Sequence, residues 1–181
     1  IRAERPAFVL HVGDIVEEGN ELGRWRAEFF APARRLLSTT PIWAVLGNHE
    51  ADSPLYYRYF GGPAPGWRQS FVFGDAACFL VDSERDLSPG SEQFVWLDRA
   101  LADSSAGWRF VVVHRPPFTS DRDEYGDTAR GGCPEGDPRT RPLVPLLEAH
   151  GVDVLFCGHV HAYERSRPVR DGRVDDDGVA M

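Results

Sequence analysis

The chain has 181 residues, of which 42% are hydrophobic and 27% charged, so we expect a soluble globular fold with a core of its own. A formal net charge of −8 without any Lys/Arg cluster argues against binding to a nucleic-acid backbone. No apolar run approaches a membrane span, and three cysteines without C-x-x-C spacing argue against a zinc ribbon or a full disulfide framework.

Hydrophobic periodicity and turn residues predict the elements of the chain. In chain order they are a strand at 7–12, a helix at 21–37, a strand at 41–46, a short helix at 53–59, a turn-rich loop at 63–67, strands at 70–73 and 76–81, a helix at 91–101, a strand at 108–113, a long polar loop at 119–141, a helix at 143–150, a strand at 152–157 and a hairpin at 167–174. Pro32 is expected to kink or divide the first long helix, and Gly151 to cap the last one.

Strands alternate with helices, and a meander interrupts them in the middle. That order predicts an α/β domain with a mixed sheet or two packed sheets and no internal domain boundary. Because plain connections are shorter, the stretch 119–141 is expected to be functional or disordered. The chain begins with Ile1 and stops where an apolar strand begins at Val179, so we expect a fragment of a longer protein.

Four short motifs follow apolar runs and carry residues that bind divalent metals. They are Gly13-Asp14, Gly47-Asn48-His49-Glu50, Val111-Val112-Val113-His114 and Gly158-His159-Val160-His161. Asp, Asn and His supply oxygen and nitrogen ligands to metals of hard or borderline character. Because open α/β sheets place their sites where strands end, the motifs predict a metal site at that edge.

These motifs, in this order and spacing and with GHVHAYER at 158–165, resemble the calcineurin-like metallophosphoesterases, and among them the purple acid phosphatase branch. The resemblance runs from Gly13 to about Val169. It implies an α/β fold, a β-sandwich of mixed sheets flanked by helices and here incomplete at both ends, as one catalytic domain over 1–181. It also implies two metal ions, with Fe, Zn and Mn as candidates, and a small phosphate-ester substrate.

The resemblance gives each motif residue a role. The implied ligands of the second metal are Asp14, Asn48, His114 and His159. Asp14 also bridges to the first metal, which His161 binds. His49 is not a ligand; it faces the substrate and assists as an acid or a charge stabiliser, and Glu50 beside it is placed to orient that imidazole.

Two positions depart from the family pattern. The opening D-x-H motif is absent upstream of Asp14, and His11 cannot replace it, so the first metal keeps only Asp14 and His161. Glu17 stands where the branch has its metal-binding tyrosine, so we expect no iron–tyrosinate site. If the chain acts alone, the resemblance predicts one metal at the second site and weak or no hydrolysis.

Other residues allow a structural as well as a functional interpretation. Arg115 is a candidate for phosphate contact, although a structural role is the stronger reading. The further candidates for substrate contact or for support of the site are Arg122, Tyr125, Arg130, Trp67, Tyr163, Glu164 and Arg165. The tryptophans expected in the core are Trp25, Trp43, Trp96 and Trp108. His11 and His150 are expected to be structural or exposed, and Cys157 is expected to be a small buried residue. One disulfide plus one free thiol among the three cysteines is left open.

The predicted function is metal-dependent hydrolysis of phosphate esters, phosphomonoesters first, by a metal-activated hydroxide that attacks phosphorus in line. A phosphodiesterase or nucleotidase of the same superfamily is the alternative enzyme. A non-catalytic metal-binding domain is the alternative from another class, because the first metal motif is absent. The family resemblance favours a secreted or periplasmic location, and the oligomeric state is left open.

Overall fold

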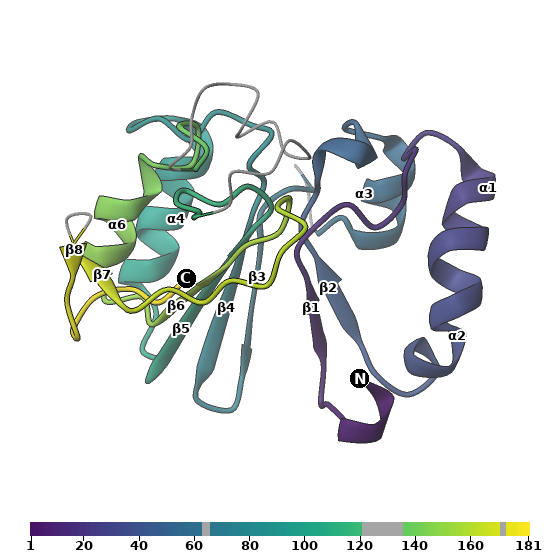
Figure 1. Ribbon diagram of the computed structural model, residues 1–181, viewed down its shortest axis with the longest axis horizontal. Helices are drawn as coiled ribbons and strands as arrows, with labels where there is room; N and C mark the ends of the chain where they lie inside the picture. Colours follow the sequence, from purple (N-terminus) through teal and green to yellow (C-terminus); the bar gives the residue numbers. More distant parts are fainter. Residues whose placement is uncertain (63–65, 121–135, 171–172) are drawn as a thin grey trace.

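Two β-sheets lie face to face between two layers of helices in the computed structural model, which describes residues 1–62, 66–120, 136–170 and 173–181 (Figure 1). The larger sheet has the order β3 (Gln69–Phe73), β4 (Ala76–Val81), β5 (Trp108–Val113) and β6 (Val154–Phe156). The smaller sheet pairs β1 (Val9–His11) with β2 (Ile42–Ala44) in parallel. Only β3–β4 is antiparallel in the larger sheet, so the predicted mixed α/β sandwich is confirmed.

A small apolar cluster joins the two sheets. Leu80 of β4 pairs with Val112 of β5, and both side chains are buried together with Val45, which follows β2. Trp43 stacks on Phe71 across the same interface, with ring centroids 4.0 Å apart. This packing holds the strands of the two sheets in register, so their carboxyl ends meet at one edge.

The helices α4 (Glu92–Ala102) and α6 (Leu143–Ala149) cover the outer face of the larger sheet (Figure 1). The buried residues of this layer are Ala77, Phe79, Val81, Leu87, Leu97, Leu101, Val111, Val113, Leu143, Leu146, Leu147, Val152, Leu155 and Val179. Ser91 begins α4 as predicted, because its hydroxyl accepts a hydrogen bond from the backbone N–H of Phe94. The continuous core on this side fixes the ends of β5 and β6.

The helix predicted at 21–37 is present as a continuous helical run, and it changes type before Pro32. It consists of α1 (Leu22–Arg24), the π-helical segment η2 (Trp25–Phe30) and α2 (Ala31–Leu37). Pro32 lies in the first turn of α2, and the widened turn before it accommodates a residue that lacks an N–H and crowds the preceding carbonyl. With α3 (Pro54–Phe60), these helices cover the outer face of β1 and β2 (Figure 1).

The remaining elements are short. They are η1 (Arg2–Glu4), η3 (Asn48–Glu50), β7 (Val169–Arg170) and β8 (Arg173–Val174). The hairpin predicted at 167–174 is present, since β7 and β8 pair antiparallel. The interiors of the predicted loops at 63–67 and 119–141 lie largely outside the described residues.

One core assignment is wrong. Trp108 was expected in the core, but its side chain is 55% exposed at the start of β5. It lies on the face of the sheet that looks toward β1 and β2, stacked on Phe110 and beyond the small cluster that joins the sheets. The apolar pattern of β5 predicted the strand correctly, but not how far the second sheet covers it.

Candidate metal centre

Asp14 directly follows β1, in a backbone conformation that a non-glycine residue rarely adopts. Its φ is +51°, in the left-handed region, and Gly13 before it has φ +90°. A Cβ at Gly47 would lie 2.3 Å from Asp14 Oδ1, so only glycine fits against this carboxylate. The backbone N–H of His49 donates to the same Oδ1 at 3.1 Å, which aims the carboxylate at the edge of the sheets.

Glu50 ties the loop after β1 to the loop after β2. Its side chain is completely buried, and it accepts hydrogen bonds from four backbone N–H groups. The donors, at 2.6–3.2 Å, are Asp14, Ile15, Val16 and Gly47. Burial raises the pKa of this carboxyl, although the same hydrogen bonds favour its charged form. Glu50 was expected to orient His49, but both of its oxygens are occupied by backbone groups.

His114 follows β5 and is completely buried. Its Nδ1 lies 2.7 Å from the carbonyl oxygen of Val12, and a carbonyl can only accept, so Nδ1 carries the proton. In the neutral imidazole Nε2 then presents its lone pair. The hydrogen bond fixes the ring in the tautomer that a metal ligand requires.

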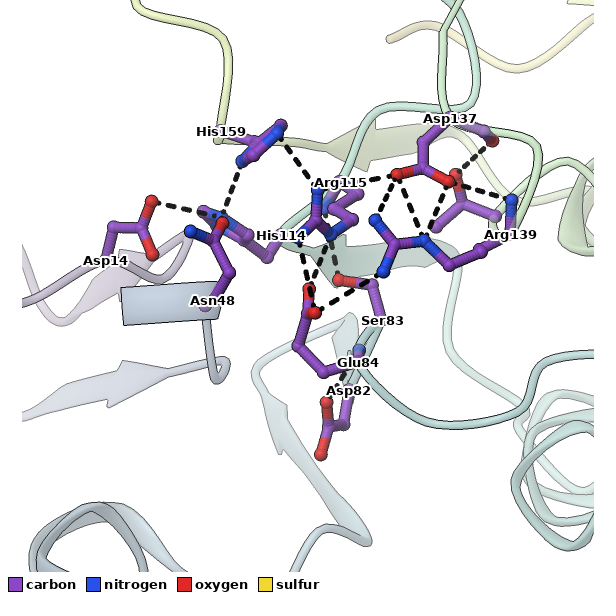
Figure 2. Close-up of polar contacts among 12 residues, drawn as sticks. Asp14, Asn48, Asp82, Ser83, Glu84, His114, Arg115, Asp137, Arg139 and His159 are labelled. Atoms are coloured by element: carbon purple, nitrogen blue, oxygen red, sulfur yellow. Dashed lines mark hydrogen bonds and ion pairs between the residues drawn. The ribbon is translucent and has the colours of Figure 1, made fainter. Parts of the chain in front are cut away.

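Three further ligand atoms converge around this nitrogen (Figure 2). His114 Nε2 lies 3.0 Å from Asn48 Oδ1, 3.2 Å from Asp14 Oδ2 and 3.2 Å from His159 Nδ1. The ligand atoms of Asp14, His114 and His159 all lie within 4.8 Å of one another. The oxygens of Asn48 and Asp14 can only accept hydrogen bonds, and they face the lone pair of His114 Nε2. A cation bound between them would interact favourably with all three atoms. The residues therefore fit a divalent metal with mixed nitrogen and oxygen ligands.

The acidity of Asp14 agrees with that interpretation. Burial alone raises its pKa, but the contacts with His114 and with His49 outweigh burial and lower the pKa overall. The carboxylate is therefore present in its charged, metal-binding form at neutral pH.

The two other predicted site histidines lie outside this convergence. His161 is exposed, two residues beyond His159, and does not belong to the cluster formed by the described residues. His49 is partly exposed, and its Nδ1 lies 2.9 Å from the carbonyl oxygen of Glu17. That hydrogen bond raises the pKa of His49 above its ordinary value. The geometry leaves Nε2 of His49 as the atom that exchanges protons.

Arg115 belongs to a charged cluster beside the convergence (Figure 2). The side chain is almost fully buried, and its guanidinium lies 2.6 Å from a Glu84 oxygen, 3.5 Å from Asp137 and 3.0 Å from His159 Nε2. Arg139 pairs with Asp137 at 2.7 Å and with Glu84 at 3.6 Å. The structural interpretation of Arg115 is therefore the better one. No sequence motif marked Glu84 or Asp137, which lie in loops far apart in the chain.

Other predictions have simpler outcomes. Trp67 is buried and so is a packing residue, and Glu164 accepts hydrogen bonds from Thr119 and Ser120. His11 Nδ1 is a buried atom without a hydrogen-bond partner among the described residues, and burial lowers the pKa of that imidazole. Cys157 is a free thiol, and burial raises its pKa to about 12.

Several predicted residues cannot be placed. Arg122, Tyr125, Arg130 and Cys133 lie outside the described residues. Of the cysteines that the structure does describe, Cys78 and Cys157 are both free. Within the same part of the chain, no helix combines the length and the apolar character needed to cross a lipid bilayer.

Comparison with known proteins identifies the family. The family model described as calcineurin-like phosphoesterase matches residues 1–163. A protein named probable inactive purple acid phosphatase 27, from Arabidopsis thaliana, is 29% identical over 94% of the chain and 31% of its own length. Purple acid phosphatase 21 of the same plant is 34% identical over 79% of the chain and 35% of its own length.

A solved structure shares the fold. The purple acid phosphatase PPD1 from yellow lupin seeds superimposes with a TM-score of 0.84 over 99% of the chain and 37% of its own length, at 20% identity. The chain thus spans about a third of the length of these relatives.

Proposed function

The chain belongs to the calcineurin-like phosphoesterase family, and on that premise we propose that it binds metal and hydrolyses phosphate esters, phosphomonoesters first. The observation that supports this most is the convergence of four ligand atoms where separate strands end. The proposed ligands of the tight ion are Asp14, Asn48, His114 and His159. Metal ions held in this way polarise phosphoryl oxygens and activate water for in-line attack.

His161 is the proposed ligand of a second ion, which it would share with Asp14. Two protein ligands are too few for tight binding, so we expect this ion to be held more weakly than the ion bound by Asp14, Asn48, His114 and His159. The exposed position of His161 agrees with a weak site that opens to solvent.

His49 is the proposed proton donor to the leaving group. Its Nδ1 is held by the Glu17 carbonyl, and that contact raises the pKa, so the ring holds a proton more readily than an isolated histidine does. Its half-exposed side chain is accessible to a substrate that approaches the cluster from solvent.

Two alternatives follow from specific observations. A phosphodiesterase or nucleotidase would use the same ligands, and the described residues do not separate the two substrate classes. A non-catalytic metal-binding domain is the other alternative, because the first metal motif is absent, His161 lies outside the convergence and several relatives are named probable inactive. A secreted or periplasmic location, taken from the family resemblance, is part of the proposal.

Metal titration of paired variants tests the ligand assignment. We expect His159→Ala to weaken binding of the tight ion about 100-fold or more, and His161→Ala to leave it unchanged, because only His159 lies among the converging atoms. Isothermal titration calorimetry with Zn²⁺ and with Mn²⁺ measures both affinities. Equal losses in the two variants would contradict the assignment.

Hydrolysis assays then separate the activities. We expect p-nitrophenyl phosphate to be cleaved faster than bis(p-nitrophenyl) phosphate in the presence of excess metal. The reverse preference would favour the phosphodiesterase. Metal binding without turnover of either compound would favour the non-catalytic alternative.

A further inference from the structure

The two histidines of the convergence have opposite hydrogen-bond partners on their far nitrogens. A metal-binding imidazole ordinarily donates its other N–H to a carbonyl or a carboxylate. His114 follows that rule, since its Nδ1 donates to the Val12 carbonyl. His159 does not, because its Nε2 lies 3.0 Å from Nη1 of Arg115. A guanidinium has five N–H donors and no acceptor, so in this pair Nε2 of His159 must accept.

That contact determines where the imidazole of His159 carries its proton. With Nε2 as an acceptor, the neutral ring has its N–H on Nδ1, which lies 3.2 Å from Nε2 of His114 and donates to it. Nδ1 is also the nitrogen of His159 that faces His114 within the convergence. The hydrogen bond from Arg115 and a metal on Nδ1 therefore exclude one another, because a metal needs the lone pair there.

We propose that Arg115 is a positioning residue that opposes metal binding through His159, and that the ion binds tightly only when Arg115 releases Nε2. The inference rests on the proposed metal centre and adds a control of its affinity. When the ring changes tautomer, its new Nε2–H requires an acceptor in place of Arg115, and the carboxylates of Glu84 and Asp137 contact the same guanidinium. Asp137 lies 3.5 Å from the Nη1 that contacts His159, and Glu84 binds the same guanidinium.

The burial of the cluster makes this opposition effective. Arg115 is 2% exposed and Asp137 4% exposed, so the guanidinium cannot simply turn to solvent when it loses His159. Its ion pairs with Glu84 and Asp137 keep it in place. Metal affinity is therefore expected to depend on a side chain that binds no metal itself.

Zn²⁺ calorimetry on the 181-residue chain tests the proposal with three proteins. We expect Arg115→Gln to bind Zn²⁺ about tenfold more tightly than the unaltered chain, because Gln presents an oxygen that can accept from Nε2–H. Arg139→Gln is the matched control, since it removes the same charge from the same two carboxylates and the described contacts of Arg139 do not include His159. It should change the affinity little.

Nitrogen-15 spectra of the histidine rings in the unaltered chain test the same point without a variant. Before metal is added, His159 should show the Nδ1–H tautomer, and Zn²⁺ should convert it to the Nε2–H tautomer, whereas His114 keeps its proton on Nδ1 throughout. A purely structural Arg115 would not produce this change at His159. A ring of His159 that is already in the Nε2–H form would overturn the proposal.

The outcomes also separate this proposal from the metal centre itself. If neither the unaltered chain nor Arg115→Gln binds Zn²⁺, the metal centre is wrong. If both bind with equal affinity, or if Arg139→Gln tightens binding as much as Arg115→Gln does, the centre stands and the role of Arg115 is wrong.

Discussion

Two halves of the candidate centre are held in place by different kinds of contact. The backbone-tied half consists of Asp14, Asn48 and His114, whose loops are joined by hydrogen bonds between Glu50 and backbone N–H groups and by the Val12 carbonyl. The side-chain-tied half consists of His159 and Arg115, and a guanidinium sets the orientation of the imidazole. A ligand held by backbone is fixed by the fold, whereas one held by a side chain can be retuned by a single substitution.

The largest effect is expected from breaking the backbone-tied half with Glu50→Ala. Four buried N–H groups lose their acceptor, and each such loss costs about 1–3 kcal/mol. We expect the free energy of unfolding to fall by more than about 4 kcal/mol, measured by urea denaturation. Glu28→Ala is the control, because its carboxylate makes exposed contacts with Glu17 and Arg24. Equal losses of unfolding free energy in the two variants would contradict the role of Glu50.

A smaller effect is expected from Gly47→Ala, where the loop after β2 touches the loop after β1. In Gly47→Ala the new Cβ would lie 2.3 Å from Asp14 Oδ1 and 2.4 Å from its backbone nitrogen, so the loop must shift. We expect a loss of about 3 kcal/mol together with weaker Zn²⁺ binding. The control Gly23→Ala adds a Cβ that meets nothing within 4 Å in a helix and should stabilise by about 0.5–1 kcal/mol. Unchanged Zn²⁺ affinity in Gly47→Ala would show that Asp14 tolerates the shift.

The smallest effect concerns the pH dependence of folding stability, through a carboxyl group close to Glu84, the partner of Arg115 in the side-chain-tied half. Burial raises the pKa of Asp82, which directly follows β4 and precedes Ser83 and Glu84, from 3.8 to about 6. A raised folded pKa means that the stability contributed by this carboxyl is fully present below pH 3.8 and is lost as pH rises through about 6.

Paired denaturation curves measure that contribution. Between pH 4 and pH 7 the unaltered chain should lose about 2 kcal/mol relative to Asp82→Asn, whose side chain does not titrate. Parallel pH profiles of the two proteins would show that Asp82 ionises normally in the fold.

The convergence of Asp14, Asn48, His114 and His159 was predictable because each lies in a short motif at the end of an apolar run. The strand before the motif identified its place at the edge of the sheets, and the family resemblance supplied its role. Pro32 and Ser91 were equally readable, since a missing N–H and a capping hydroxyl act on the residues next to them.

The contacts that orient the proposed ligands were not predictable in the same way. Glu50 reaches backbone groups 34–36 residues earlier in the chain, so its neighbour His49 was a misleading guide to its role. Arg115 meets Glu84 and Asp137 only after β4 and β5 have paired. The exposure of Trp108 depends on the extent of the opposite sheet, which no pattern within β5 encodes.

The strand order also has a consequence for the order of folding. The hairpin β3–β4 pairs neighbours in the chain, whereas β1–β2, β4–β5 and β5–β6 are parallel and must each wait for a crossover to close. Asp14 and His159 meet only when nearly the whole chain has been looped together. We therefore expect the hairpin to form early and the ligand cluster last, so that its assembly reports completion of the native topology.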